Sequence, residues 1–281
     1  MADDPNLSTN QNNSLALLNQ WLGSFNLGSL ADTVKSWIIN GYSDDRIKLE
    51  LQNTDTFKQE FPEYHARLNA GLTPMTPAEI MSYRNTAKKL MSDAGMPAGF
   101  YDEKTDFVDL VTKDISPNEL AQRIQGGYTK VQQAPAEVKQ AFADYFGVQG
   151  DAYLASFFLD PTRSTDLIQR DLTKAEIGGA GYQYGFGTTA AEAQRLAEQG
   201  ITGDQARQGY QQAYDLKPLE EETINEEGDL TKGELAEGVM TGGAARSKVQ
   251  RRQQERSAAF AGGGGGAGQG RQGLGLGSSN G

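Results

Sequence analysis

Apolar residues recur every three or four positions along most of the chain, which is the period of one face of an α-helix. The clearest segment has apolar positions from Ile80 to Met91 and ends at Gly95, a residue type common just after helices. Alternating patterns bounded by Asn-Gly or Asp-Gly turns, which are typical of strands, are nearly absent. The pattern therefore predicts an all-α fold of many short helices. Further helices are predicted at 14–22, 29–39, 44–52 and 62–70, and from Pro135 to Gly147. Another helix is predicted after Ser116, and Gly126-Gly127 weakens its middle.

Capping boxes predict where five of the helices begin. In this motif a Ser or Thr side chain caps a free backbone N–H at the helix start, and a Glu or Gln three residues later bonds back to it. Two of the boxes also place proline at the first helical position, where its missing N–H costs nothing. The five boxes are Thr76-Pro77-Ala78-Glu79, Ser116-Pro117-Asn118-Glu119, Thr189-Ala190-Ala191-Glu192, Thr202-Gly203-Asp204-Gln205 and Thr231-Lys232-Gly233-Glu234.

Composition divides the chain into five parts. The asparagine-rich start predicts a flexible arm, and the glycine-rich end cannot bury a core and is expected to be disordered. Between them, the composition shifts where a run of glycine with aromatic residues begins, and again where the charge changes sign. The predicted parts are a flexible arm (1–13), a helical domain (14–177), a Gly/aromatic loop with a helix pair and an acidic segment (178–243), a basic helix (244–260) and a disordered Gly-rich tail (261–281).

The composition excludes several kinds of chemistry. The chain has no cysteine, so we expect no disulfide, Cys-ligated zinc, iron–sulfur cluster or thiol nucleophile. A multi-histidine metal centre needs more than the single histidine, His65. A net charge of -11 disfavours a large nucleic-acid surface, which needs clustered Lys and Arg. We therefore expect no catalytic, cofactor-binding or metal-binding site, and no enzymatic activity.

The sequence also lacks the features of a secretory signal and of a membrane segment. The acidic start lacks the cationic segment and apolar run of a secretory signal. No run of about 18 apolar residues occurs, so we expect no membrane segment. Synthesis in a cytoplasm is the corresponding expectation.

Two patterns that could carry chemistry have simpler structural interpretations. The glycine run 262–270 lacks the Lys-Ser/Thr pair and the preceding strand of a phosphate-binding loop. The spacing of Asp102, Asp106 and Asp109 suggests a calcium loop. Lys104 stands at a position where such a loop needs an oxygen ligand, so helix-capping acids are the favoured interpretation.

Three further patterns could mark a catalytic or binding site. Glu60, Glu63 and His65 have no partner motif, so a surface or partly buried histidine is favoured. Residues 178–187 are either a loop where backbones pack closely or an aromatic docking strip. The helix pair that follows has the spacing of a DNA-binding helix-turn-helix, but its second helix offers only Arg207 as a cation. A hairpin used for packing is therefore favoured.

The basic segment 244–260 is the candidate binding site. It holds five Lys or Arg and one Glu, and it follows an acidic segment, 215–237, with nine Asp or Glu and two Lys. Such charge can fix the orientation of a chain on a partner's carboxylates. Contact with the acidic segment of the same chain or a neighbour, contact with nucleic-acid phosphate, and a solvated spacer are the open alternatives. The candidate partner-binding residues are Arg246, Lys248, Arg251, Arg252, Arg256 and Phe260.

The capping and aromatic motifs also form two longer stretches within residues 50–270. The first contains Thr56-Phe57-Lys58-Gln59-Glu60-Phe61-Pro62, Leu72-Thr73-Pro74-Met75-Thr76-Pro77-Ala78-Glu79, Gly99-Phe100-Tyr101-Asp102 and Asp114-Ile115-Ser116-Pro117-Asn118-Glu119-Leu120. The second contains Gly185-Phe186-Gly187, the helix pair, and a basic segment ending Ala258-Ala259-Phe260-Ala261-Gly262 before a Gly/Ser tail. These stretches resemble a family of uncharacterised minor structural proteins of tailed bacteriophages. The shared motifs are structural, so the resemblance implies no active site.

The resemblance implies a virion component, either tail-associated or inside the head near the portal. We then expect portal, tail or capsid proteins as partners, an oligomeric state within the assembly, and at most a minor contact with packaged DNA. An assembly scaffold or chaperone that leaves before maturation is the alternative, since acidity and helicity fit it as well. A phage lytic enzyme is least favoured, because no motif pairs two carboxylates.

Overall fold

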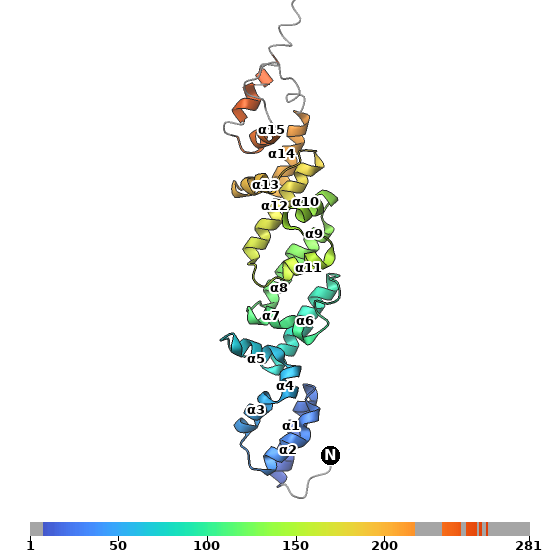
Figure 1. The fold of residues 1–281 in the computed structure, drawn as a ribbon, viewed down its shortest axis with the longest axis vertical. Helices are drawn as coiled ribbons and strands as arrows, with labels where there is room; N and C mark the ends of the chain where they lie inside the picture. Colours follow the sequence, from blue (N-terminus) through green and yellow to red (C-terminus); the bar gives the residue numbers. More distant parts are fainter. Residues whose placement is uncertain (1–7, 217–231, 243–245, 252, 255–256, 258–281) are drawn as a thin grey trace, which may run out of the picture. The chain divides into compact units, whose positions relative to one another are not determined.

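Many helices of this chain begin where a side chain bonds to a backbone N–H that the helix itself leaves free. The computed structural model describes residues 8–216, 232–242, 246–251, 253–254 and 257. Across this described part every regular element is a helix, which confirms the all-α prediction (Figure 1). The elements are α1 (Thr9–Ser24), η1 (Gly28–Leu30), α2 (Ala31–Ile39), α3 (Asp44–Asn53), α4 (Asp55–Glu60), α5 (Pro62–Asn69), α6 (Pro77–Asp93), η2 (Lys104–Phe107), α7 (Val108–Thr112), α8 (Pro117–Arg123), the π-helical turn η3 (Ile124–Tyr128), α9 (Thr129–Gln133), α10 (Ala136–Phe146), α11 (Asp151–Leu159), α12 (Thr165–Gln183), α13 (Ala190–Glu198), α14 (Gly203–Asp215) and α15 (Lys232–Met240).

Three of the five predicted capping boxes form both of their bonds. In the box of α6, Glu79 N donates to Thr76 Oγ1 (3.3 Å), and Thr76 N donates to Glu79 Oε2 (2.7 Å). The bond from Thr76 N, together with one from the Thr76 hydroxyl (2.9 Å), stabilises the carboxylate and lowers the pKa of Glu79. The boxes that begin at Thr189 and Thr202 form in the same way.

One of the other two boxes differs from the prediction. Ser116 caps α8 by accepting a bond from Glu119 N (3.1 Å), but the Glu119 carboxylate bonds to Arg123 instead of returning to the cap. The fifth box begins at Thr231, which lies outside the described residues.

The N-terminal helix starts earlier than predicted. Ser8 and Gln11 form a capping box, so α1 already begins at Thr9. The flexible arm over 1–13 is therefore wrong for residues 9–13, and residues 1–7 lie outside the described part. The short helix α4 was also missed, because Thr54 caps it without a Glu or Gln three residues later.

The single helical domain predicted over 14–177 is divided in the structure. One compact unit, unit 1, comprises Met1–Ala134 and Phe142–Leu172, and the other, unit 2, comprises Pro135–Ala141 and Thr173–Gly281. Helices α10 and α12 each contribute residues to both units. In unit 1 the helices pack mainly on their near neighbours along the chain: α1 on α2, α2 on α3, α3 on α4 and α4 on α5.

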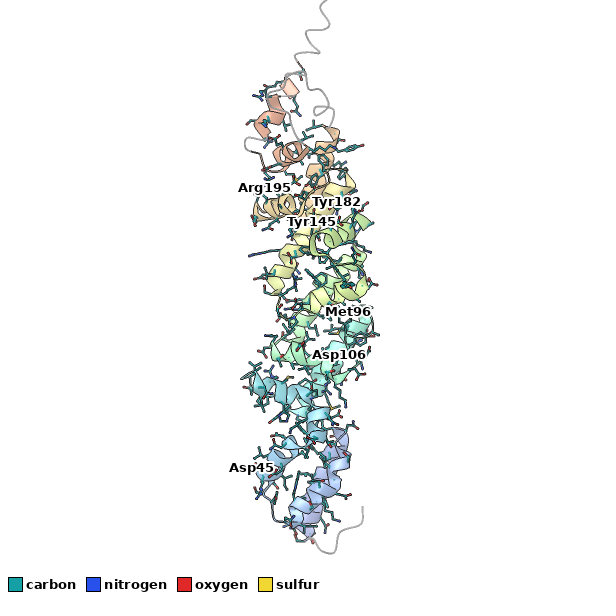
Figure 2. All side chains as sticks on the ribbon, viewed as in Figure 1. Asp45, Met96, Asp106, Tyr145, Tyr182 and Arg195 are labelled. Atoms are coloured by element: carbon teal, nitrogen blue, oxygen red, sulfur yellow. The ribbon has the colours of Figure 1, made fainter. Side chains whose placement is uncertain are left out.

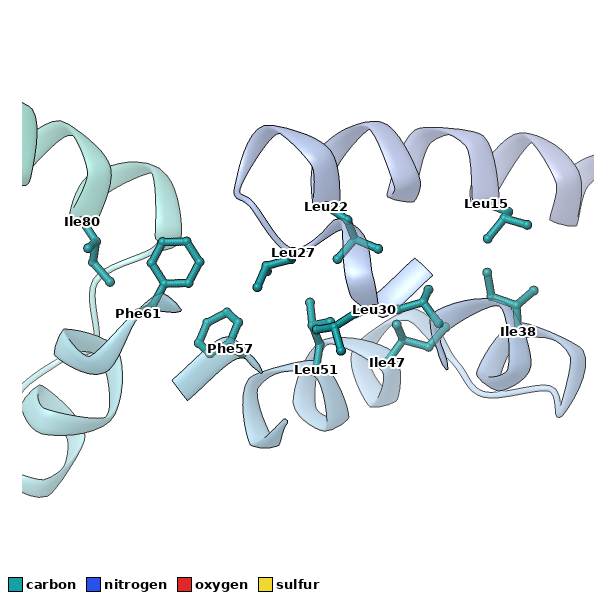
Figure 3. Packing of buried hydrophobic residues seen from close by; sticks show 11 residues of the cluster. Leu15, Leu22, Leu27, Leu30, Ile38, Ile47, Leu51, Phe57, Phe61 and Ile80 are labelled. Atoms are coloured by element: carbon teal, nitrogen blue, oxygen red, sulfur yellow. The ribbon is translucent and has the colours of Figure 1, made fainter. Parts of the chain in front are cut away.

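The largest N-terminal cluster of buried residues joins α1 to α6 through these neighbour contacts. Leu22 and Leu27 are fully buried and face Leu51 across the first three helices (Figure 3). Phe57 and Phe61 continue the cluster toward α6, and their rings lie 5.2 Å apart. Each helix therefore buries its apolar face against the next one, as expected for elements too short to be stable alone.

The Gly126-Gly127 pair lies in a π-helical turn rather than in a weakened α-helix. Gly127 packs directly against the ring of Phe158 on α11, where a Cβ atom would collide with ring carbons. Phe158 in turn stacks on Phe142 of α10, with ring centroids 5.7 Å apart. Glycine at 127 is thus required for close approach, whereas Gly126 has room for a methyl group.

Residues 178–187 are mostly helical, so the predicted loop is wrong for 178–183. Helix α12 continues to Gln183, and only the following residues turn before α13. The predicted close backbone packing is present, because a Cβ on Gly179 would lie 2.6 Å from Val138 Cα. The helix pair is confirmed as α13 and α14.

The membrane expectation also has a structural counterpart. Within the described residues no helix is both long and apolar enough to cross a bilayer.

We expect Gly127→Ala and Gly126→Ala to have opposite effects on stability. The first substitution forces a methyl group into the Phe158 ring and should lower the free energy of unfolding by about 1–3 kcal/mol. The second adds a better helix former whose Cβ would lie 3.5 Å from Gln169 Nε2, an ordinary contact, and should raise it by up to about 1 kcal/mol. Denaturant unfolding of both variants measures this, and equal effects would contradict the packing at Gly127.

Candidate functional site

The described part of the basic segment is helical from Arg246 to Arg251. Arg246 and Arg251 are exposed, whereas Val249 keeps only 5% of its surface exposed. Lys248 Nζ donates to Glu234 Oε1 at 2.6 Å. Lys248 therefore bonds within its own chain, to the acidic segment, which was one of the open alternatives. The other candidate residues, Arg252, Arg256 and Phe260, lie outside the described residues.

The support for this helix is α15, the described end of the acidic segment. Leu235 and Ala236 are buried, and α15 packs on α14. The contact is close because Gly209 leaves room for Met240, where a Cβ would collide with the Met240 side chain. Part of the acidic segment is therefore the helix that the capping box at Thr231 predicted, whereas its packing on α14 was not predicted.

Ion pairs add to this arrangement in unit 2. Arg195 of α13, labelled in Figure 2, donates to Glu237 Oε2 of α15 at 2.9 Å. Both side chains keep substantial exposure, so the pair contributes at most about 1 kcal/mol. Its role is to set orientation, while burial of α15 supplies the stability.

A buried polar pair joins a residue of α14 to the residue before the N-cap of α13. Thr188 Oγ1 donates to the hydroxyl of Tyr210 at 2.8 Å. The ring of Phe186 lies 5.2 Å from that of Tyr210, so the aromatic residues of 178–187 pack within unit 2. Burial disfavours the tyrosinate and raises the pKa of Tyr210 to about 12.

The residues of the candidate catalytic cluster, Glu60, Glu63 and His65, make structural contacts. Glu63 is fully buried and accepts two bonds from Arg84, each 2.6 Å long. Glu60 accepts a bond from Lys104, and His65 Nε2 lies 2.8 Å from the carbonyl oxygen of Gln52. Because a carbonyl oxygen only accepts, Nε2 carries the proton. The favoured interpretation of a partly buried histidine is therefore confirmed.

Two of the three candidate calcium-binding aspartates, Asp102 and Asp106, bond to nearby backbone N–H groups. Asp102 accepts a bond from Gly99 N (2.6 Å), and Asp106 accepts one from Glu103 N (2.8 Å). Among the described residues no group of three or more His, Cys, Asp or Glu side chains is placed to hold a metal ion.

Sequence reasoning missed a hollow of about 350 Å³ on unit 1. Its lining combines apolar side chains from two distant stretches with three carboxylates. We call it the acidic hollow; its main lining residues are Phe100, Leu110, Leu159, Asp106, Asp109 and Asp160.

Arg123 holds one side of the acidic hollow in place. Its guanidinium is 1% exposed and donates to the carbonyl oxygens of Asp160 (2.8 Å) and Arg163 (2.5 Å). It also bonds Glu119 at 2.8 Å, so the segment after α11 is tied to α8. The only sequence signal was an Arg four residues after an N3 glutamate, a spacing that is common on solvated helices.

Comparisons with known proteins identify no relative of this chain. No protein-family model, curated protein or solved structure matches this chain.

The buried tyrosine predicts a change of stability with alkaline pH. The pKa of Tyr210 is raised in the folded state, so its contribution is complete below pH 10 and is lost as the pH rises toward 12. At pH 7, Tyr210→Phe should lower the free energy of unfolding by about 0.5–1.5 kcal/mol through loss of one hydrogen bond. Denaturant midpoints measured from pH 7 to 11 should converge for the two proteins. A constant difference across that range would contradict the prediction.

Proposed function

We infer that this chain is a non-enzymatic structural component of a tailed bacteriophage particle that binds other virion proteins. The observation that carries the proposal is the resemblance of two stretches to minor structural proteins of such phages. In the structure, residues of these motifs determine the fold, either as helix caps or as core side chains. Thr76 and Ser116 cap α6 and α8, and Phe57 and Phe61 lie in the core. A resemblance concentrated in fold-determining residues supports a shared architecture.

Helix α1 adds support for binding to proteins. It carries no charged side chain over its 16 residues, while Leu17 keeps 69% of its surface exposed and Trp21 keeps 38%. The centres of protein interfaces are depleted in charge and enriched in aromatic residues. This helix therefore has the composition of a contact surface rather than of a solvated one.

The C-terminal region adds a second kind of contact. Lys248 bonds the basic helix to Glu234 of α15 and Val249 is buried, while Arg246 and Arg251 are exposed. Exposed arginines fix the orientation and raise the rate of encounter with carboxylates of a partner. Portal, tail and capsid proteins are the partners that the proposal names.

An assembly scaffold or chaperone is the second candidate. The observation that favours it is a net charge of -11 on an all-helical chain, since an acidic protein is easily kept soluble until it meets its substrate. Such a factor leaves the particle before maturation, which makes the two candidates experimentally distinct.

Mass spectrometry of purified particles tests the proposal directly. We expect the chain in mature virions at a constant copy number. Its presence in precursor shells alone would support the scaffold, and its absence from both would overturn both candidates. Assays of the purified chain on peptidoglycan should show no cleavage, and activity there would support the lytic enzyme.

The exposed arginines give a prediction by substitution. Arg246→Glu combined with Arg251→Glu should reduce incorporation into particles several-fold while the helical content stays unchanged, because both side chains are exposed. Arg170→Glu combined with Arg207→Glu is the matched control, as it also reverses two exposed arginines, one on α12 and one on α14. Incorporation is measured by quantitative mass spectrometry, and equal loss in the control would assign the effect to net charge alone.

A further inference from the structure

The acidic hollow has the chemistry to hold a cation on an apolar stem. Leu110 and Leu159 are buried and form the apolar part of its lining, together with half-buried Phe100. Arginine and lysine side chains suit such a lining, because their methylene groups pack on apolar surface while the charged end meets carboxylates. An aromatic ring adds a favourable face for a guanidinium.

The carboxylates of the hollow keep capacity to accept such a cation. Within the described part of the chain, the exposed carboxylate of Asp109 has no hydrogen-bond or ion-pair partner. Asp106, labelled in Figure 2, uses one oxygen to accept a single bond, from Glu103 N. Asp160 bonds Thr162 and lies 3.5 Å from Arg163 Nε. The site is thus acidic, preformed and only partly neutralised.

We propose that the acidic hollow of one copy of this chain binds the basic segment 244–260 of a second copy. The proposal rests on the proposed function in taking that segment as a binding element, and it names the partner. Charge complementarity identifies the occupant. The segment holds five Lys or Arg and one Glu in a chain whose net charge is -11; Lys248 bonds Glu234 of its own chain, and Arg246 and Arg251 are exposed.

The geometry of such a contact determines the kind of assembly. The hollow belongs to unit 1 and the basic segment to unit 2, so the two surfaces that meet are different. If the two copies exchange segments reciprocally the contact closes a symmetric dimer, whereas a head-to-tail contact produces closed rings or open filaments. Each copy would offer one hollow and one basic segment.

Sedimentation velocity of the full chain tests the self-association. We expect it to strengthen with protein concentration and to weaken between low and high salt, since exposed charges are screened. Asp109→Arg should weaken association by about tenfold or more, because it places like charges together. Asp45→Asn on α3 is a matched control at a 97% exposed carboxylate, and it should leave association unchanged. A chain that stays monomeric at all concentrations would overturn the proposal.

A binding measurement in trans identifies the two surfaces. The acceptor is the full chain with Arg246, Arg251, Arg252 and Arg256 changed to Gln, which removes competition from its own segment. A fluorescent peptide of residues 244–260 should bind this acceptor, and the addition of Asp109→Arg should weaken binding by about tenfold while Asp45→Asn does not. Circular dichroism checks that each acceptor keeps its helices.

Each alternative outcome of the peptide experiment is informative. Equal binding to the Asp109→Arg acceptor would remove the hollow as the site. Equal binding of an unrelated peptide with the same charge, or full competition by spermidine at matched charge, would remove the second copy as its specific occupant. Because none of these readouts uses virus particles, failure here leaves the virion proposal standing, and absence from virions would leave this one.

Discussion

The fold depends on one constraint, which is that most of its helices are too short to be stable alone. Isolated helices below about 12–15 residues are marginal in water, and helices such as α4 and α7 are far shorter than that. Each helix therefore needs an exact start and a neighbour against which it buries its apolar face. Caps at residues such as Thr54 and Thr76 supply the starts, and contacts between near neighbours along the chain supply the burial.

Two arginines, the buried Arg123 and Arg84 with 12% of its side chain exposed, join segments that lie apart in the sequence. Arg84 meets the fully buried carboxylate of Glu63, and Arg123 holds the carbonyl groups of Asp160 and Arg163. A buried ion pair contributes little net stability, but loss of one partner leaves a charge without compensation. These residues therefore fix a unique arrangement of helices, and in the case of Arg123 they also shape the acidic hollow.

The proposed functions depend on surfaces that remain accessible after the helices have packed. Helix α1 presents exposed apolar residues without charge, the basic segment presents arginines, and the acidic hollow presents carboxylates next to apolar side chains. We propose that these are surfaces for binding proteins. Their charges govern encounter and register, and burial at the contact would supply the affinity.

The sequence by itself determined the helical class and most helix boundaries, because caps, periodic apolar residues and terminal glycines act within a few neighbouring residues. It also indicated the basic segment, and it showed that the chain has no cysteine and a single histidine. Contacts between distant residues were decided only by the tertiary structure. Gly127 reads as a helix-weakening residue until Phe158 is seen against it, and the run after 178 reads as a loop until Gly179 meets Val138. Asp106 and Asp109 share a hollow with Asp160 only after folding, since a pattern confined to neighbouring positions carries no information on which distant side chains will meet.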